Sequence, residues 1–218
     1  MFQDYCIIFD MDGVLADTVP IHFKSWVKMA AEIGINFTRE MFEDTFGQQS
    51  NTIIRKLVGP EIEEYLIEKW ANLKEKYYRE MVRGKLIPVP GVLKIIKRLK
   101  SKGFKLAVGS SGPPENVELI LSELKIKTYF DVIITAVDVK KGKPEPDVFL
   151  IVAKKLNINP KNCLVIEDAP VGIQAAKRAG MISIALTTTH KKEELLDAQL
   201  IIKNLTEIKV VDIINLFD

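Results

Sequence analysis

Short apolar runs alternate with amphipathic segments along most of the chain. The runs that predict buried strands are Tyr5–Phe9, Lys105–Gly109, Val132–Thr135, Cys163–Ile166, Ile182–Leu186 and a shorter one, Leu200–Ile202. Helical periodicity follows in the segments Val92–Ser101, Pro114–Leu124, Asp147–Leu156, Val171–Ala179 and Glu207–Leu216. Strands that alternate with helices predict an α/β fold, a Rossmann-like parallel sheet with helices on both faces.

The region from Ile21 to Gly84 breaks this alternation and contains no convincing strand. Helical patterns cover Ile21–Ile33, Ser50–Leu57 and Pro60–Val82, and Thr38 is expected to cap the start of a further helix. Because this region directly follows the first strand, it predicts an inserted helical domain over residues 18–87. Residues 1–17 and 88–218 would then form the sheet-containing core.

Composition and charge narrow the classes of partner. The 218 residues carry 31 basic and 29 acidic side chains, a formal net charge of +2, which gives no support for a nucleic-acid or membrane-surface partner. No apolar stretch is long enough to span a membrane, and no basic segment precedes the first strand, so a cytoplasmic location is expected. Cys6 and Cys163 lie inside strand-like runs and are expected to be reduced core residues, and a monomer is the default expectation.

Chemically capable side chains follow four of the predicted strands. Asp10 ends the first strand and Ser110 ends the second, Lys143 lies beyond the third, and Glu167 and Asp168 end the fourth. Since the carboxyl ends of parallel strands meet at one edge of a sheet, these residues are expected to converge there.

The closely spaced Asp10 and Asp12 suggest a particular chemistry. Two carboxylates held together repel each other unless a cation lies between them, and oxygen ligands suit Mg²⁺. Asp10 would attack phosphorus to form an aspartyl-phosphate, and Asp12 would act as general acid and base. Ser110 and Lys143 would bind the phosphoryl group, with Ser111 beside them. Asp10, the Asp12 carbonyl, Glu167 and Asp168 would hold Mg²⁺.

Each of these motifs also has a purely structural explanation. The Asp-x-Asp-Gly sequence occurs in turns, Ser110 and Ser111 could cap a helix, and Glu167 with Asp168 could begin one. Lys143 lies in a lysine-rich stretch that could be a solvated surface. Their shared placement at one predicted sheet edge favours the catalytic interpretation.

Taken together, the motifs resemble the haloacid dehalogenase superfamily of phosphatases. The matching segments are Asp10-x-Asp12-Gly13-Val14, the strand end at Ser110, Gly142-Lys143-Pro144-x-Pro146-Asp147 and Glu167-Asp168 with Gly172-Ile173. The likeness is to the branch with a helical cap after the first strand, which includes β-phosphoglucomutase. It implies a Rossmann-like core, an aspartyl-phosphate intermediate and dependence on Mg²⁺. The acid at Asp12 favours phosphoryl transfer over dehalogenation.

Cap residues near the hinge are expected to face the active site, namely Thr18, His22, Lys24 and Trp26. The same resemblance implies that Thr18 and His22 approach the substrate, whereas Trp26 suits the core of the cap better. The loop Gln48-Gln49-Ser50-Asn51 matches the specificity loop of the family. There β-phosphoglucomutase carries an arginine for a second phosphate, whereas this chain has none before Arg55. Neutral side chains suit a hydroxyl-rich substrate, although the loop could simply be solvated.

The sequence therefore predicts a Mg²⁺-dependent phosphatase of a small phosphorylated metabolite, a sugar or polyol monophosphate. Two alternatives stay open. A phosphomutase of the β-phosphoglucomutase type would transfer the phosphoryl group to a sugar hydroxyl instead of water. A non-enzymatic phospho-aspartate switch would use a similar arrangement, but the second acid and the inserted helices argue against it.

Overall fold

A computed structural model describes residues 2–59 and 61–217. Its six strands are β1 (Cys6–Phe9), β2 (Lys105–Gly109), β3 (Val132–Ile134), β4 (Cys163–Glu167), β5 (Ile182–Leu186) and β6 (Leu200–Ile202). All neighbouring strands pair in parallel, in the order β3-β2-β1-β4-β5-β6. The predicted α/β class and parallel sheet are confirmed, with each strand within a residue of its expected bounds.

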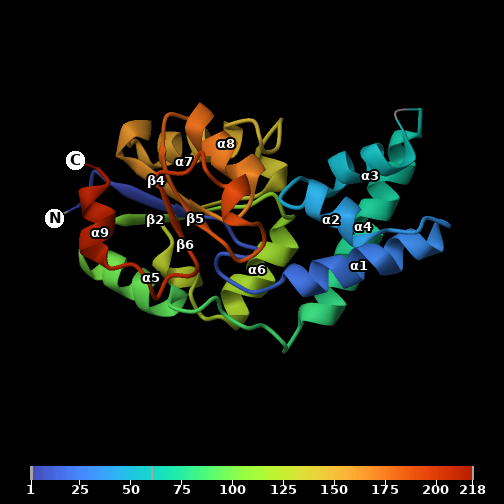
Figure 1. The fold of residues 1–218 in the computed structure, drawn as a ribbon, viewed down its shortest axis with the longest axis horizontal. Coiled ribbons are helices and arrows are strands. Elements are labelled where there is room, and N and C mark those ends of the chain that lie inside the picture. Colours follow the sequence, from blue (N-terminus) through green and yellow to red (C-terminus); the bar gives the residue numbers. More distant parts are fainter. Residues whose placement is uncertain (1, 60, 218) are drawn as a thin grey trace.

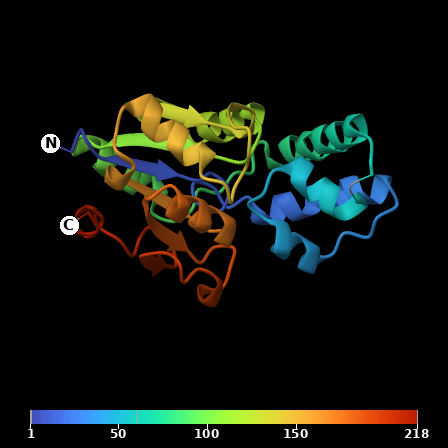
Figure 2. The ribbon, with the colours of Figure 1, turned by 90° about the horizontal axis from the view of Figure 1, so that it is seen from above.

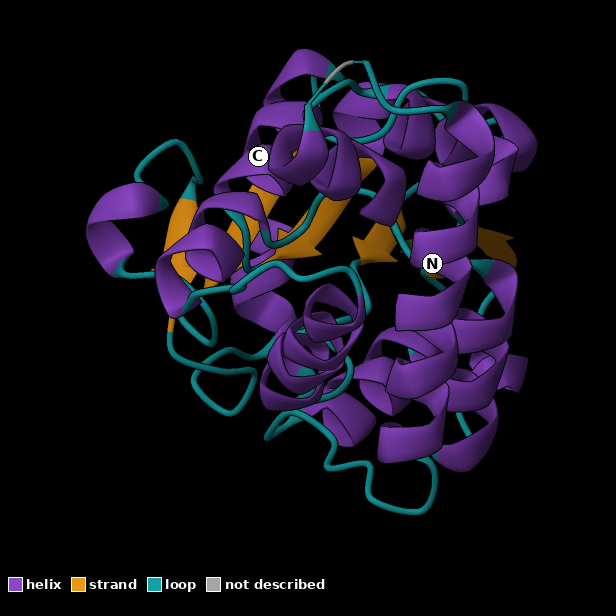
Figure 3. Ribbon diagram, turned by 90° about the vertical axis from the view of Figure 1, so that its right-hand side faces the viewer, coloured by secondary structure: helices purple, strands orange, loops and turns teal. Residues whose placement is uncertain are grey.

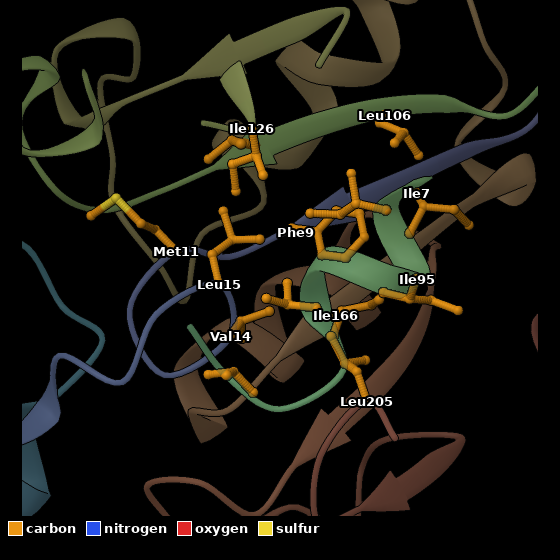
Figure 4. Packing of buried hydrophobic residues seen from close by; sticks show 14 of the residues in the cluster. Ile7, Phe9, Met11, Val14, Leu15, Ile95, Leu106, Ile126, Ile166 and Leu205 are labelled. Atoms are coloured by element: carbon orange, nitrogen blue, oxygen red, sulfur yellow. The ribbon is translucent and has the colours of Figure 1, made fainter. Parts of the chain in front are cut away.

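Helices cover both faces of the sheet because successive strand residues point to opposite sides (Figure 3). The helices of the core are α5 (Val92–Ser101), α6 (Pro114–Glu123), α7 (Asp147–Leu156), α8 (Pro170–Arg178) and α9 (Val210–Asn215). Ile7 and Phe9 of β1 pack in one apolar cluster with residues of α5, α6 and α9, while Cys6 and Ile8 face α7 and α8. Figure 4 shows Ile7 and Phe9 beside Ile95 of α5. Complete burial of a side chain such as Ile7 contributes roughly 1.5–3 kcal/mol.

A cluster of four helices lies beside the carboxyl end of the sheet, opposite the two termini (Figures 1 and 2). These helices, called the cap here, are α1 (Val19–Glu32), α2 (Arg39–Thr45), α3 (Ser50–Val58) and α4 (Glu64–Val82). They enclose an apolar cluster of their own that includes Trp26, Phe42 and Ile67. The domain boundaries at 17/18 and 87/88 stay a prediction.

The helix starts of the cap can be compared with the sequence prediction. Thr38 caps α2 as expected, since its hydroxyl accepts a hydrogen bond from Met41 N at 3.2 Å. The helix expected from Pro60 begins at Glu64 instead, and Pro60 itself lies outside the described residues. The last helix of the core, α9, begins at Val210 and ends at Asn215, so it is shorter than the expected segment Glu207–Leu216.

The two connections between cap and core run side by side. Asp17 N donates to Ile87 O at 2.8 Å, and Val89 N donates to Leu15 O at 3.2 Å. This pairing closes the cap back onto the core just after Asp12, so the cap begins and ends next to the predicted site. No helix in the described part of the chain has the length and apolar character needed to cross a membrane.

Candidate active site

The predicted residues of the core converge at the carboxyl edge of the sheet. β1 is central, and the chain leaves it to build strands on both sides, so the ends of β2 and β4 flank Asp10. In open parallel sheets a crevice forms where the strand order reverses in this way. Asp10, Ser110 and Asp168 all line one cavity of about 50 Å³ there, which is called the catalytic cavity below.

Lys143 connects two carboxylates from different strands. Its Nζ donates to Asp10 Oδ1 at 2.6 Å and to Glu167 Oε1 at 2.5 Å, and all three side chains are almost completely buried. The other oxygen of Glu167 accepts from the N–H groups of Asp168 and Ala169 at 2.8 and 2.9 Å. Lys143 therefore fixes the relative position of Asp10 and Glu167, which are 157 residues apart in the sequence.

Three acidic groups at this edge lie close enough to share a metal ion. Carboxylate oxygens of Asp10, Glu167 and Asp168 all fall within 4.8 Å of one another, and all three residues are buried. Burial raises the pKa of Asp10 to about 7, with Lys143 opposing and Glu167 adding to the rise. Burial and the charges of Glu167 and Asp10 also raise the pKa of Asp168. Lys143 alone does not compensate this negative charge, so the donor set fits a hard divalent cation such as Mg²⁺.

Two glycines make room for these carboxylates. A Cβ atom on Gly172 would lie 1.8 Å from Glu167 Oε1, and a Cβ on Gly13 would lie 1.9 Å from Asp168 Oδ2. Gly13 also has a φ of +77°, which favours glycine. Thr189 also donates a hydrogen bond to Asp168. The acidic cluster thus depends on small residues in two separate places, the turn after β1 and the first turn of α8.

Asp12 is held by the cap. Its Oδ1 accepts hydrogen bonds from Thr18 Oγ at 2.5 Å and Tyr78 Oη at 3.0 Å, and His22 Nε2 lies 3.0 Å away. Burial alone would raise the pKa of Asp12, but His22, Thr18 and Lys74 outweigh it and lower the pKa to about 2. In this arrangement Asp12 is ionised at neutral pH and can accept a proton.

The remaining predicted residues separate into two groups. His22, Gln48, Ser50 and Ser111 line the catalytic cavity. Gln49 and Asn51 line a second, larger cavity instead, and Thr18 is buried behind Asp12. The expectation for Lys24 is wrong: its side chain is exposed and lines neither cavity, because it lies on the outer face of α1. Trp26 is buried in the cap core, as expected, and also borders the catalytic cavity.

Three cap residues at the site were not anticipated from the sequence. Lys74 and Glu75 form a buried ion pair at 2.9 Å, and Lys74 Nζ lies 2.9 Å from His22 Nδ1. Tyr78 stacks on His22 with ring centroids 4.0 Å apart. The sequence does contain a feature that indicates buried charges here: Lys74 and Glu75 fall on the apolar stripe of α4, which includes Ile67 and Val82. Charged residues at such positions need buried partners.

Comparison with known proteins identifies the family of this chain. The family model of haloacid dehalogenase-like hydrolases matches residues 7–186. The chain belongs to this family. A β-phosphoglucomutase from Bacillus subtilis is 33% identical over 210 residues, which cover 93% of this chain and 90% of that protein. A validoxylamine A 7'-phosphate phosphatase from Streptomyces hygroscopicus subsp. limoneus is 31% identical over 206 residues, covering 93% and 94%.

A solved structure of a related protein has the same fold as this haloacid dehalogenase-like hydrolase. The β-phosphoglucomutase from Clostridium difficile superposes with a TM-score of 0.88 at 29% identity, covering 98% of this chain and 96% of that one. The resemblance inferred from the motifs is confirmed. The relatives include both phosphatases and phosphomutases, so membership of the family leaves the choice of acceptor, water or sugar, to the residues of the site.

Proposed function

We propose that this protein is a Mg²⁺-dependent phosphatase of sugar or polyol monophosphates that acts through an aspartyl-phosphate. The observation that carries the proposal is that Lys143 bridges Asp10 and Glu167 beside Asp168. Asp10 and Asp168 also line a cavity whose other wall is formed by residues of the cap. A fructose-1-phosphate phosphatase from Escherichia coli, 33% identical over 84% of this chain, supports the substrate class.

Asp10 is the nucleophile in this mechanism. One of its carboxylate oxygens attacks the phosphorus atom, the bond from phosphorus to the substrate oxygen breaks, and the phosphoryl group is left on Asp10. Lys143, already 2.6 Å from Asp10, and Ser110 at the end of β2 bind the phosphoryl oxygens. Mg²⁺ bound by Asp10, Glu167, Asp168 and the Asp12 carbonyl would supply charge neutralisation, so that one anion can approach another.

Asp12 acts as the general acid and then as the general base. It donates a proton to the departing substrate oxygen and then accepts one from the water that hydrolyses the aspartyl-phosphate. Its contacts with Thr18, Tyr78 and His22 favour the ionised form, which suits the second step. For the first step Asp12 must gain a proton, and the negative charge of the incoming phosphate promotes this.

The test is phosphate release from a panel of phosphorylated sugars and polyols, with Mg²⁺ and with a chelator. We expect hydrolysis that requires Mg²⁺ and is abolished by Asp10→Asn while the thermal unfolding curve stays cooperative. Substantial turnover by the Asn variant would refute the role of Asp10.

The second candidate is a phosphomutase, favoured by the likeness to β-phosphoglucomutases in both sequence and structure. It would convert β-glucose 1-phosphate to glucose 6-phosphate with little free phosphate, and only when a trace of the 1,6-bisphosphate is present. Product analysis in the same assay distinguishes the two.

A further inference from the structure

A second cavity adjoins the catalytic cavity beneath the cap. It has a volume of about 210 Å³ and shares Ser50, Glu75 and Ser111 with the catalytic cavity. A substrate whose phosphoryl group lies at Asp10 would therefore extend past these shared residues into the second cavity. Its size accommodates several further carbon atoms, so the part of the substrate that does not react has a defined place.

The lining of the second cavity is polar but carries no positive charge. Its polar side chains among the described residues are Gln49, Ser50, Asn51, Asn72, Glu75 and Ser111, and Glu75 is the charged one. Amides and hydroxyls both donate and accept hydrogen bonds, as sugar hydroxyls require. A phosphate group would instead need lysine or arginine side chains to offset its charge.

Glu75 is fixed at the boundary between the two cavities. Its Oε1 accepts from Ser50 Oγ at 2.5 Å and from Lys74 Nζ at 2.9 Å, and its Oε2 accepts from Asn116 Nδ2 at 2.6 Å. Three donors from two cap helices and one core helix hold this carboxylate in a single position while it is buried. The Glu75 charge therefore cannot swing away from an incoming anion.

The same contact also holds in place Lys74, a cation of the cap beside the catalytic cavity. Lys74 lines the catalytic cavity but is paired with Glu75. Arg55, the first arginine after the specificity loop, is exposed, pairs with Glu64 and lines neither cavity. Neither side chain is available to bind an anionic group in the second cavity.

We propose that the second cavity binds the uncharged, hydroxyl-bearing part of the substrate and that Glu75 excludes substrates with a second phosphate. This inference rests on the proposed function and deepens it, because it makes Glu75 a specificity-determining residue. It also argues for hydrolysis over mutase chemistry, since a mutase must hold a bisphosphate in both orientations.

The experiment compares sugars that differ by one phosphate. Values of kcat/KM are measured for fructose 1-phosphate with fructose 1,6-bisphosphate, and for glucose 6-phosphate with glucose 1,6-bisphosphate. We expect the monophosphate to be preferred on the order of 100-fold in the wild type, and the preference to fall about tenfold in Glu75→Gln. Glu80→Gln, exposed on the same helix, is the matched control and keeps the wild-type preference.

A second variant covers the possibility that Glu75→Gln folds poorly. Asn72 is exposed and lines the second cavity, so Asn72→Lys adds a cation there without disturbing the core. We expect it to raise kcat/KM for bisphosphates relative to monophosphates, whereas Asn72→Gln does not.

Binding to the Asp10→Asn protein separates this inference from the proposed function. If no sugar phosphate is hydrolysed, the proposed function fails, but tighter binding of monophosphates than of bisphosphates would still support the role of Glu75. Equal or tighter binding of bisphosphates by the protein with Glu75 intact would overturn it.

Discussion

The hydroxyl of Thr18 donates a 2.5 Å hydrogen bond to Asp12, although Thr18 occupies the N-cap position of α1. A threonine there ordinarily accepts a hydrogen bond from the first turn of its own helix. Here the hydroxyl is directed to the core instead, so the first residue of the cap contacts the proposed acid–base group. Movement of α1 would therefore act directly on Asp12.

Replacing Thr18 with valine removes this hydrogen bond while keeping the shape of the side chain. Because hydrogen bonds to charged groups contribute about 1.5–3 kcal/mol, we expect a fall in kcat of roughly tenfold or more. The pKa of Asp12 should rise, so the acidic limb of the pH–rate profile moves to higher pH. Thr38→Val, which removes the cap of α2, is the control: it should lower stability by about 1 kcal/mol but leave that limb in place.

Lys143→Met should destabilise the fold as well as abolish activity. Without Nζ, the carboxylates of Asp10 and Glu167 are buried and uncompensated, which typically costs about 3–5 kcal/mol. Urea unfolding measures the loss, and added Mg²⁺ should restore part of it by supplying positive charge. Unchanged stability would contradict this account of Lys143. Lys177→Met breaks an exposed pair with Asp197, so it should change stability by less than about 1 kcal/mol.

Gly172→Ala tests the packing around the acidic cluster. The added Cβ would collide with Glu167 Oε1, so we expect Glu167 to move and the affinity for Mg²⁺ to fall about 10–100-fold. Calorimetric titration with Mg²⁺ provides the measurement. Gln174→Ala, exposed on the same helix, should bind Mg²⁺ normally. If both variants bind equally, the glycine is not needed for the metal site.

Glu75 should make stability depend on pH. Burial tends to raise the pKa of Glu75, but Lys74, His22 and Ser50 outweigh it and lower the pKa below 4.5. A group with a lowered pKa in the folded state stabilises the protein above its ordinary pKa, and this contribution is lost as the pH falls through the folded value. The stability difference between wild type and Glu75→Gln should therefore be largest near pH 7 and shrink below pH 4.5.

That difference can be followed by urea unfolding across the same range. A difference that grows on acidification would have the wrong sign and would refute the ionised, paired state of Glu75. Glu80→Gln, whose pair with Lys76 is exposed, should alter stability by less than about 1 kcal/mol at pH 7.

The part of the site that lies in the core could be predicted from the sequence because the topology of a parallel sheet determines which residues come together. Asp10, Ser110 and Glu167 each sit at the end of an apolar run, and parallel strands bring such ends together whatever their separation along the chain. The cap was harder. Helical periodicity located its helices, but the partner of each side chain depends on how α1 and α4 pack, which periodicity does not specify.

Lys74 and Lys24 illustrate the difference. Lys24 is near His22 in sequence and was expected at the site, yet its position on α1 turns it to the outside. Lys74 is 52 residues from His22 but contacts its ring, because α4 packs against α1. The interactions that hold Asp12 and Glu75 depend on such contacts between distant helices.

The central place of β1 in the sheet has a consequence for how the protein folds. Ser110 and Lys143 come from the half of the sheet built by β2 and β3, whereas Glu167 and Asp168 come from the half begun by β4. The site is complete only after both halves have paired with β1, and pairings of such large sequence separation form slowly. A newly made chain with only β2 and β3 paired to β1 would hold Lys143 and Asp10, but Glu167 and Asp168 would still be missing from the site. Recovery of activity during refolding would thus report the last long-range pairing instead of the first collapse.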